Sequence, residues 1–131
     1  MRAVFFSVLL LPFLCACAAS KLDIIQVGPW FPAVNWREVE VFSSRSGIVR
    51  PWGAIAILHS PRVGAAAGEA RLEKLKEGTR RAAAGLGADA VIITVEAAAE
   101  DPGMGVYREP EQYISALAIK YVTASSTTAA K

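Results

Sequence analysis

The stretch LEKLKEGTRRAAAGLGADAVIITV, residues 72–95, decides the fold. Its first half carries one apolar stripe at spacings of three and four residues, the period of an α-helix. The stripe consists of Leu72, Leu75, Thr79, Ala82 and Leu86, widened by Ala83. Charged side chains fill the other faces, and Gly87 can take the left-handed conformation that ends a helix. The pattern predicts an amphipathic helix over residues 68–86.

Segments on both sides of this helix have the composition of strands. Residues 91–95 form a run of mostly β-branched side chains, which predicts a central strand. Alternating or isoleucine-rich runs predict further strands at residues 39–42, 54–59 and 112–122. The sequence therefore predicts an α+β fold in the order β-β-α-β-β, with a single helix packed on a small mixed or antiparallel sheet.

The first residues have the pattern of a secretory signal peptide. Arg2 is followed by an almost wholly apolar run over residues 3–14. A short basic start followed by ~7–15 apolar residues is typical of export signals. The run is shorter than the ~20 residues that a membrane-spanning helix needs, so we expect export and not a permanent span.

The end of this signal resembles the bacterial lipobox. It reads Leu14-Cys15-Ala16-Cys17, and in a lipobox the last cysteine receives a diacylglycerol. The alternative is ordinary cleavage after Ala18 or Ala19. Residue 18 is not Asp, which by resemblance to Gram-negative lipoproteins favours the outer membrane. We expect a signal peptide over residues 1–16, a lipid on Cys17, a tether over 17–36, an α+β domain over 37–123 and a disordered tail over 124–131.

Composition narrows the chemistry of the domain. The only two cysteines are Cys15 and Cys17, so the domain itself offers no thiol. Without Arg2, the chain keeps 13 basic and 12 acidic side chains, and it lacks the basic excess of nucleic-acid binders. His59 is the only histidine, whereas transition-metal sites usually use several ligands. We therefore expect no nucleic-acid partner, catalytic residue, cofactor or metal ligand.

Two groups of side chains are candidates for contact with another molecule. Trp30 and Trp36 lie in the predicted tether, where they either belong to a plain linker or pack onto the domain or its partner. Tyr107 lies in the loop before the last strand, and aromatic residues are enriched at interfaces. The same loop, residues 96–111, collects carboxylates that are either solvated or able to bind a cation or move protons, namely Glu96, Glu100, Asp101, Glu109 and Glu111.

Residues 82–92 read AAAGLGADAVI, a helix end that runs directly into a strand. This stretch resembles the RcsF-like outer-membrane lipoproteins and the YbjQ-type domains named for heavy-metal binding. The resemblance covers residues 39–122 and implies a small β-β-α-β-β envelope domain. RcsF-like sensors carry disulfides within the domain, and this chain has no cysteine there, so no functional residue is carried over.

Taken together, these features predict a non-enzymatic, lipid-anchored protein of the bacterial cell envelope. We expect it at the outer membrane, facing the periplasm, where it binds or senses a protein partner. Two alternatives stay open. One is a small-ligand or metal-binding domain, including a hydrolytic one, that uses the acidic loop 96–111. The other is a homo-oligomeric structural module whose sheet edges pair between subunits.

Overall fold

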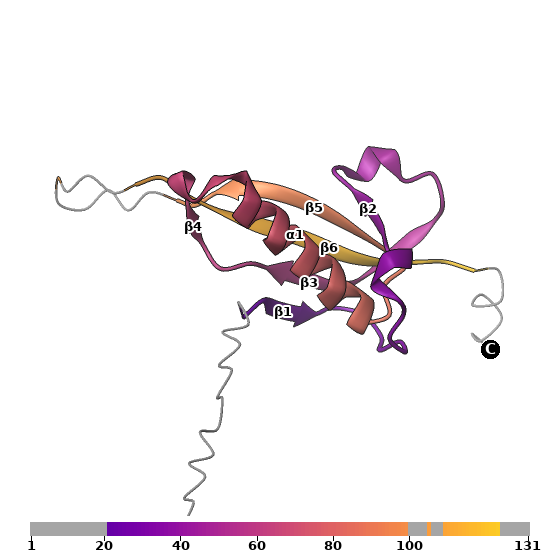
Figure 1. The fold of residues 1–131 in the computed structure, drawn as a ribbon. Coiled ribbons are helices and arrows are strands. Elements are labelled where there is room, and N and C mark those ends of the chain that lie inside the picture. The colour runs from indigo at the N-terminus through magenta and orange to yellow at the C-terminus, as the bar shows by residue number, and fades with distance from the viewer. Residues whose placement is uncertain (1–20, 100–104, 106–108, 124–131) are drawn as a thin grey trace, which may run out of the picture.

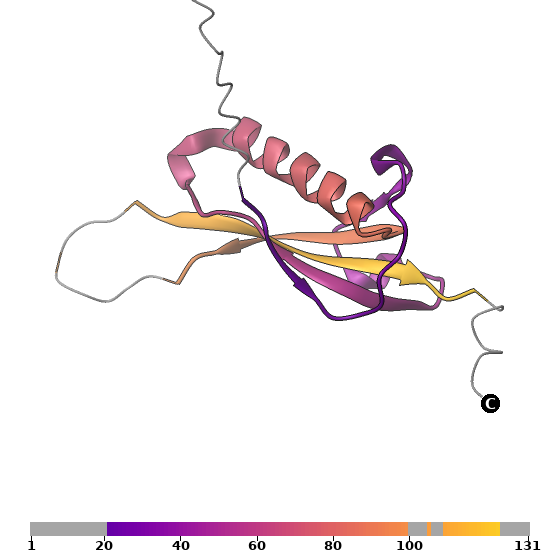
Figure 2. The ribbon, with the colours of Figure 1, turned by 90° about the horizontal axis from the view of Figure 1, so that it is seen from below.

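The computed structural model describes residues 21–99, 105 and 109–123. In this part of the chain, one α-helix lies across one face of a mixed sheet (Figures 1 and 2). The strands are β1 (Asp23–Gln26), β2 (Glu40–Phe42), β3 (Trp52–His59), β4 (Val63–Gly64), β5 (Ala90–Ala97) and β6 (Glu111–Tyr121). The helices are α1 (Gly68–Gly85) and the short 3-10 turns η1 (Trp36–Glu38), η2 (Arg45–Gly47) and η3 (Ala65–Ala67).

The six-stranded sheet has the order β1-β3-β6-β5-β2, and β4 pairs with the far end of β6. All pairings are antiparallel except that of β2 with β5. The predicted α+β class, with one helix on a mixed sheet, is confirmed. The predicted order β-β-α-β-β is wrong, because it lacks β1 and β4. Both are short and lie at the margin of the sheet, so neither has the alternation that marks a half-buried strand.

The apolar stripe of α1 packs on the sheet as its spacing predicts. Leu75, Thr79 and Ala83 are buried, while Leu72, Ala82 and Leu86 are partly buried against the same core. The Thr79 hydroxyl donates to the Leu75 carbonyl at 2.8 Å, which satisfies a polar group inside this core. The sheet contributes the facing side chains Leu58, Val91, Ile93, Ile114, Ala116 and Ala118.

The end of α1 is a Schellman motif. The Gly87 N–H donates to Ala84 at 3.0 Å, and the Ala88 N–H donates to Ala83 at 3.1 Å. Gly87 has φ of 79°, and a Cβ there would lie 2.5 Å from the Cβ of Phe31. Gly87 therefore meets two demands, a left-handed turn and a close approach of the chain before η1.

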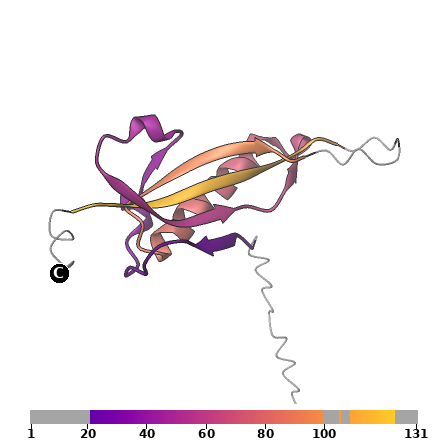
Figure 3. The same ribbon diagram turned by 180° about the vertical axis from the view of Figure 1, so that it is seen from behind.

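The face of the sheet away from α1 carries a smaller core. Ile92 and Ile119 are buried there against Phe42, Ile48 and Trp52. Figure 3 shows the loop with η2 beside this end of the sheet. Loop 43–51 thus protects one end of the second face.

Residues 21–36 of the segment expected as a tether take part in the domain. Ile24 and Ile25 belong to β1, which pairs with β3. The Val34 N–H donates to the Ala84 carbonyl of α1 at 2.9 Å, and Phe31 packs on the core. Within the described residues, no helix combines the length and apolarity that crossing a bilayer requires.

Candidate functional site

A groove of about 410 Å³ lies between α1 and the sheet where β2 ends. We call it the α1–β5 groove. Val41 of β2 and Ile93 of β5 contribute its apolar surface, and Trp36 of η1 lies beside them. The remaining lining comes from charged side chains of α1, which are Glu73, Lys74, Lys76, Glu77 and Arg80.

Trp36 is surrounded by guanidinium groups. The guanidinium carbons of Arg37, Arg80 and Arg81 lie 4.7, 5.4 and 4.4 Å from its ring centroid. Cations at this range are attracted to an indole face. Arg80 also donates to the carbonyls of Val39 and Arg37 at 2.8 and 2.9 Å, which fixes η1 against α1. Trp36 is therefore a positioned side chain in the groove wall.

The charges around the groove leave a positive excess. Lys76 pairs with Glu73 at 2.7 Å, and the Arg81 Nε donates to Glu77 at 3.0 Å, so both groove carboxylates are engaged. In the described part of the chain, Arg37, Lys74 and Arg80 have no carboxylate within ion-pair distance. Of these three cations, Lys74 and Arg80 line the groove, so an acidic group entering it would meet both.

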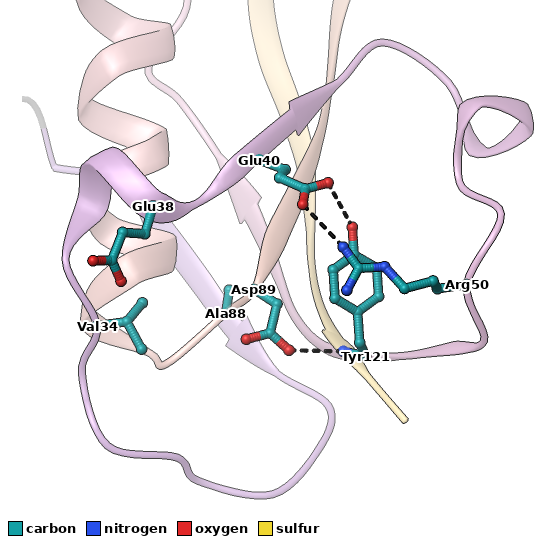
Figure 4. Close-up of a pocket in the computed structure, with 7 residues that line it drawn as sticks. All are labelled: Val34, Glu38, Glu40, Arg50, Ala88, Asp89 and Tyr121. Atoms are coloured by element: carbon teal, nitrogen blue, oxygen red, sulfur yellow. Dashed lines mark hydrogen bonds and ion pairs between the residues drawn. The ribbon is translucent and has the colours of Figure 1, made fainter. Parts of the chain in front are cut away.

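A second hollow, of about 230 Å³, lies where β2 and β5 begin and β6 ends (Figure 4). There Glu40 accepts from Arg50 at 3.1 Å and from the Tyr121 hydroxyl at 2.9 Å. The Arg50 guanidinium lies 4.0 Å from the Tyr121 ring centroid. Burial raises the pKa of Tyr121, and its hydrogen bond to Glu40 raises that pKa further. These contacts tie β2 and the loop after η2 to β6.

Asp89 completes the same network. It accepts from the Tyr121 main-chain N–H and from the Lys120 ammonium, both at 2.9 Å. Lys120 also donates to the Gly87 carbonyl at 2.9 Å. The two carboxylates Glu40 and Asp89 are thus already bonded within the protein. We therefore interpret the contacts at this hollow as structural: they hold the ends of the strands together.

The four predicted contact and anchor residues fall in different places. Cys17 and Tyr107 lie outside the described residues. Trp30 is 78% exposed, and Trp36 is half-buried in the wall of the α1–β5 groove. Contact of Trp30, Trp36 and Tyr107 with a partner stays a prediction.

The acidic loop is partly described. Glu109 accepts from the Ala66 N–H at 2.6 Å, and Glu111 lies 3.9 Å from Arg62. Glu96 accepts from the Tyr113 hydroxyl at 2.9 Å, and this bond raises the pKa of Tyr113. No three metal-ligating side chains come together within the described residues.

Glu100 and Asp101 lie outside that part of the chain. The ligand-binding alternative at loop 96–111 therefore stays a prediction.

The α1–β5 groove was not predicted from the sequence. Its walls come from segments far apart in the chain, at Trp36, Val41, Lys74 and Ile93. In the sequence, Lys74 and Arg80 are typical of a solvent-exposed helix face. Only the position of β2 beside one end of β5 turns that face into a groove wall.

Comparisons with known proteins bear on the fold. No family model matches the chain, and no curated protein matches it significantly. Among solved structures, it is similar to the crystal structure of a Francisella virulence factor, FvfA. That match has a TM-score of 0.50 and 15% sequence identity, and it covers 75% of this chain and 95% of the other. At this identity, the likeness establishes a similar fold and nothing further.

Proposed function

We propose that this chain is a lipid-anchored protein of the bacterial cell envelope that acts by binding another protein and not by catalysis. The observation that carries the proposal is the α1–β5 groove, where Trp36, Val41 and Ile93 lie beside charged side chains of α1. Tryptophan and arginine are enriched where proteins bind one another, and such surfaces combine apolar with polar side chains.

The anchor rests on Leu14–Cys17 and places the domain near the membrane. Five residues separate Cys17 from the first residue of β1 at Asp23. An extended chain of this length spans about 20 Å at most. A partner of the groove is therefore a membrane protein or a periplasmic protein that reaches the membrane surface. Because residue 18 is Ala, the outer membrane is the membrane we propose.

Photo-crosslinking in living cells tests the protein-binding proposal. A photoreactive phenylalanine analogue at Val41, in the groove, should give a discrete crosslinked product with another envelope protein. The same analogue at Val49, which is 94% exposed outside the groove, is the matched control and should not give that product. Equal products from both positions, or none from Val41, would contradict the proposal.

The anchor has its own test. Cys17→Ala removes the thiol that would carry the lipid, so the protein should lose its acyl mass and leave the outer-membrane fraction. Cys15→Ala, two positions earlier, is the control and should keep both. Intact mass and membrane fractionation give the readout. Wild-type protein without acyl mass would refute the anchor and leave the groove proposal standing.

A further inference from the structure

We propose that the partner enters the α1–β5 groove as an extended, acidic peptide segment that adds a strand to the free edge of β5. This inference rests on the protein-binding function proposed above and specifies its partner. Addition of a strand to an open sheet edge is a recurring mode of peptide recognition, in which main-chain hydrogen bonds give affinity and alternate side chains give specificity.

The main chain of β5 has outward-facing groups beyond β2. The Ala98 N–H, just after β5, donates to the Glu111 carbonyl of β6 at 2.9 Å. In an antiparallel ladder, residues bonded to the partner strand alternate with residues whose main-chain groups point away from it. By this alternation, Val95 and Ala97 direct their N–H and C=O groups away from β6.

The strand β2 does not reach these groups. It pairs only with residues 90–92 of β5, and Figure 1 shows the chain turning away to η2 beyond that point. Within the described residues, the outward groups of Val95 and Ala97 therefore have no ladder partner. A strand placed after β2, along the same edge, would satisfy them.

The side chains beside this edge suit an alternating peptide. Val41 pairs with Val91, Ile93 with Ala116 and Val95 with Ile114. Cross-strand partners share a face, and Val91, Ala116 and Ile114 belong to the core under α1. Val41 and Val95 are 50% and 43% exposed on that face, so they would pack against every second side chain of an added strand.

Charge specifies the occupant further. The unmatched cations Lys74 and Arg80 line the groove, as described above, and favour carboxylates on the added strand. Glu96 is the acidic residue of β5, and its side chain is bonded to Tyr113. Glu96 pairs with Tyr113 across the strands and follows Val95 directly in β5. Because successive strand residues point to opposite faces, Glu96 and Tyr113 lie on the face away from α1.

Peptide probes test the inference on the full chain purified in detergent. The probe is a fluorescent acetyl-(Glu-Val)3-amide, compared with acetyl-(Lys-Val)3-amide and with a (Glu-Val)3 peptide N-methylated at alternate residues. Anisotropy should give binding of the Glu-Val probe at least about tenfold tighter than of the other two, because they lose charge complementarity or main-chain donors. Amide NMR shifts should centre on Val95 and Ala97.

Matched variants localise the binding. Lys74→Glu should weaken the Glu-Val probe about tenfold and strengthen the Lys-Val probe. Arg71→Glu makes the same charge change on the same helix outside the groove lining, so it should leave both probes unchanged. Val95→Pro removes an outward N–H and should abolish binding while circular dichroism confirms the fold, since an edge position tolerates proline.

Several results would overturn the inference. Equal binding of the Glu-Val and Lys-Val probes, an N-methylated probe that binds undiminished, or unmoved Val95 and Ala97 amides would each do so. Protection of these amides without probe would identify a second copy or another segment of the chain as the occupant. If the probes fail while crosslinking from Val41 persists, strand addition is wrong and the protein-binding function stands. If both fail, both are wrong.

Discussion

Gly87 shows how one residue fixes the junction between helix and sheet. Its φ of 79° suits glycine, and the space beside its Cα is taken by Phe31 and Pro32. Gly85, two residues earlier, lies on the helix with open space around it. The two glycines therefore have different physical roles, although both belong to the same AAAGLGADAVI stretch.

Alanine at these two positions should have opposite effects. Gly87→Ala places a Cβ against Phe31 in a left-handed turn and should lower the free energy of unfolding by at least about 1–3 kcal/mol. Gly85→Ala should leave it unchanged or raise it by about 0.4–1 kcal/mol, because the unfolded chain loses freedom. Urea unfolding of the two variants measures the difference. A Gly87→Ala protein as stable as Gly85→Ala would refute the role given to Gly87.

Tyr121 gives a prediction about pH. Its pKa lies above the ordinary 10.0 in the folded protein, so the folded state holds the phenolic proton more tightly than the unfolded state does. The stabilisation is complete below pH 10 and is lost as the pH rises through the folded pKa. Tyr121→Phe should make the unfolding midpoint less sensitive to pH in this alkaline range. An identical pH profile for variant and wild type would contradict this assignment.

At the scale of elements, periodicity predicted the helix well and the sheet margins poorly. The stripe from Leu72 to Leu86 gave the position of α1 and its buried face. The run over residues 91–95 predicted the strand β5, because burial on both faces selects β-branched side chains. Residues 91–93 are buried as this pattern predicts, whereas Thr94 and Val95 are exposed. The strand β1 escaped prediction because its side chains lie at an exposed edge, and β4 is a two-residue bridge.

The groove escaped prediction for a different reason. Its position follows from β2 pairing parallel to β5 over three residues, and no local pattern specifies such a long-range pairing. Trp36 was predicted as a candidate contact, but its arginine neighbours Arg80 and Arg81 lie more than forty residues away in sequence. Only the strand order and the position of the helix show that Trp36 and these arginines form one surface.

The helix stripe makes a graded prediction about stability. Leu75 is 6% exposed in the main core, so Leu75→Ala should cost about 2–5 kcal/mol of unfolding free energy. Leu72 is only partly buried near the start of the same helix, and Leu72→Ala should cost clearly less. Chemical unfolding gives both values. Equal costs would mean that the stripe is not buried as the fold requires.

At the scale of the whole molecule, the two faces of the sheet have different roles. One face carries α1 and, beside it, the α1–β5 groove; the other is protected at one end by loop 43–51. The network of Glu40, Arg50, Tyr121 and Asp89 holds β2 in the short position that leaves the rest of β5 open. The start of β5 is thus held by this network, whereas the edge of its last residues is open.

Residue-resolved amide exchange tests the central claim, that the protein binds a partner at this open edge. In the free protein, Val95 and Ala97 should exchange fast while Thr94 and Glu96, bonded to β6, exchange slowly. The partner is the protein that crosslinking from position 41 identifies. In its complex with the wild-type chain, the amides of Val95 and Ala97 should exchange as slowly as those of Thr94 and Glu96. Slow exchange at Val95 and Ala97 in the free protein, or no change in the complex, would contradict the account.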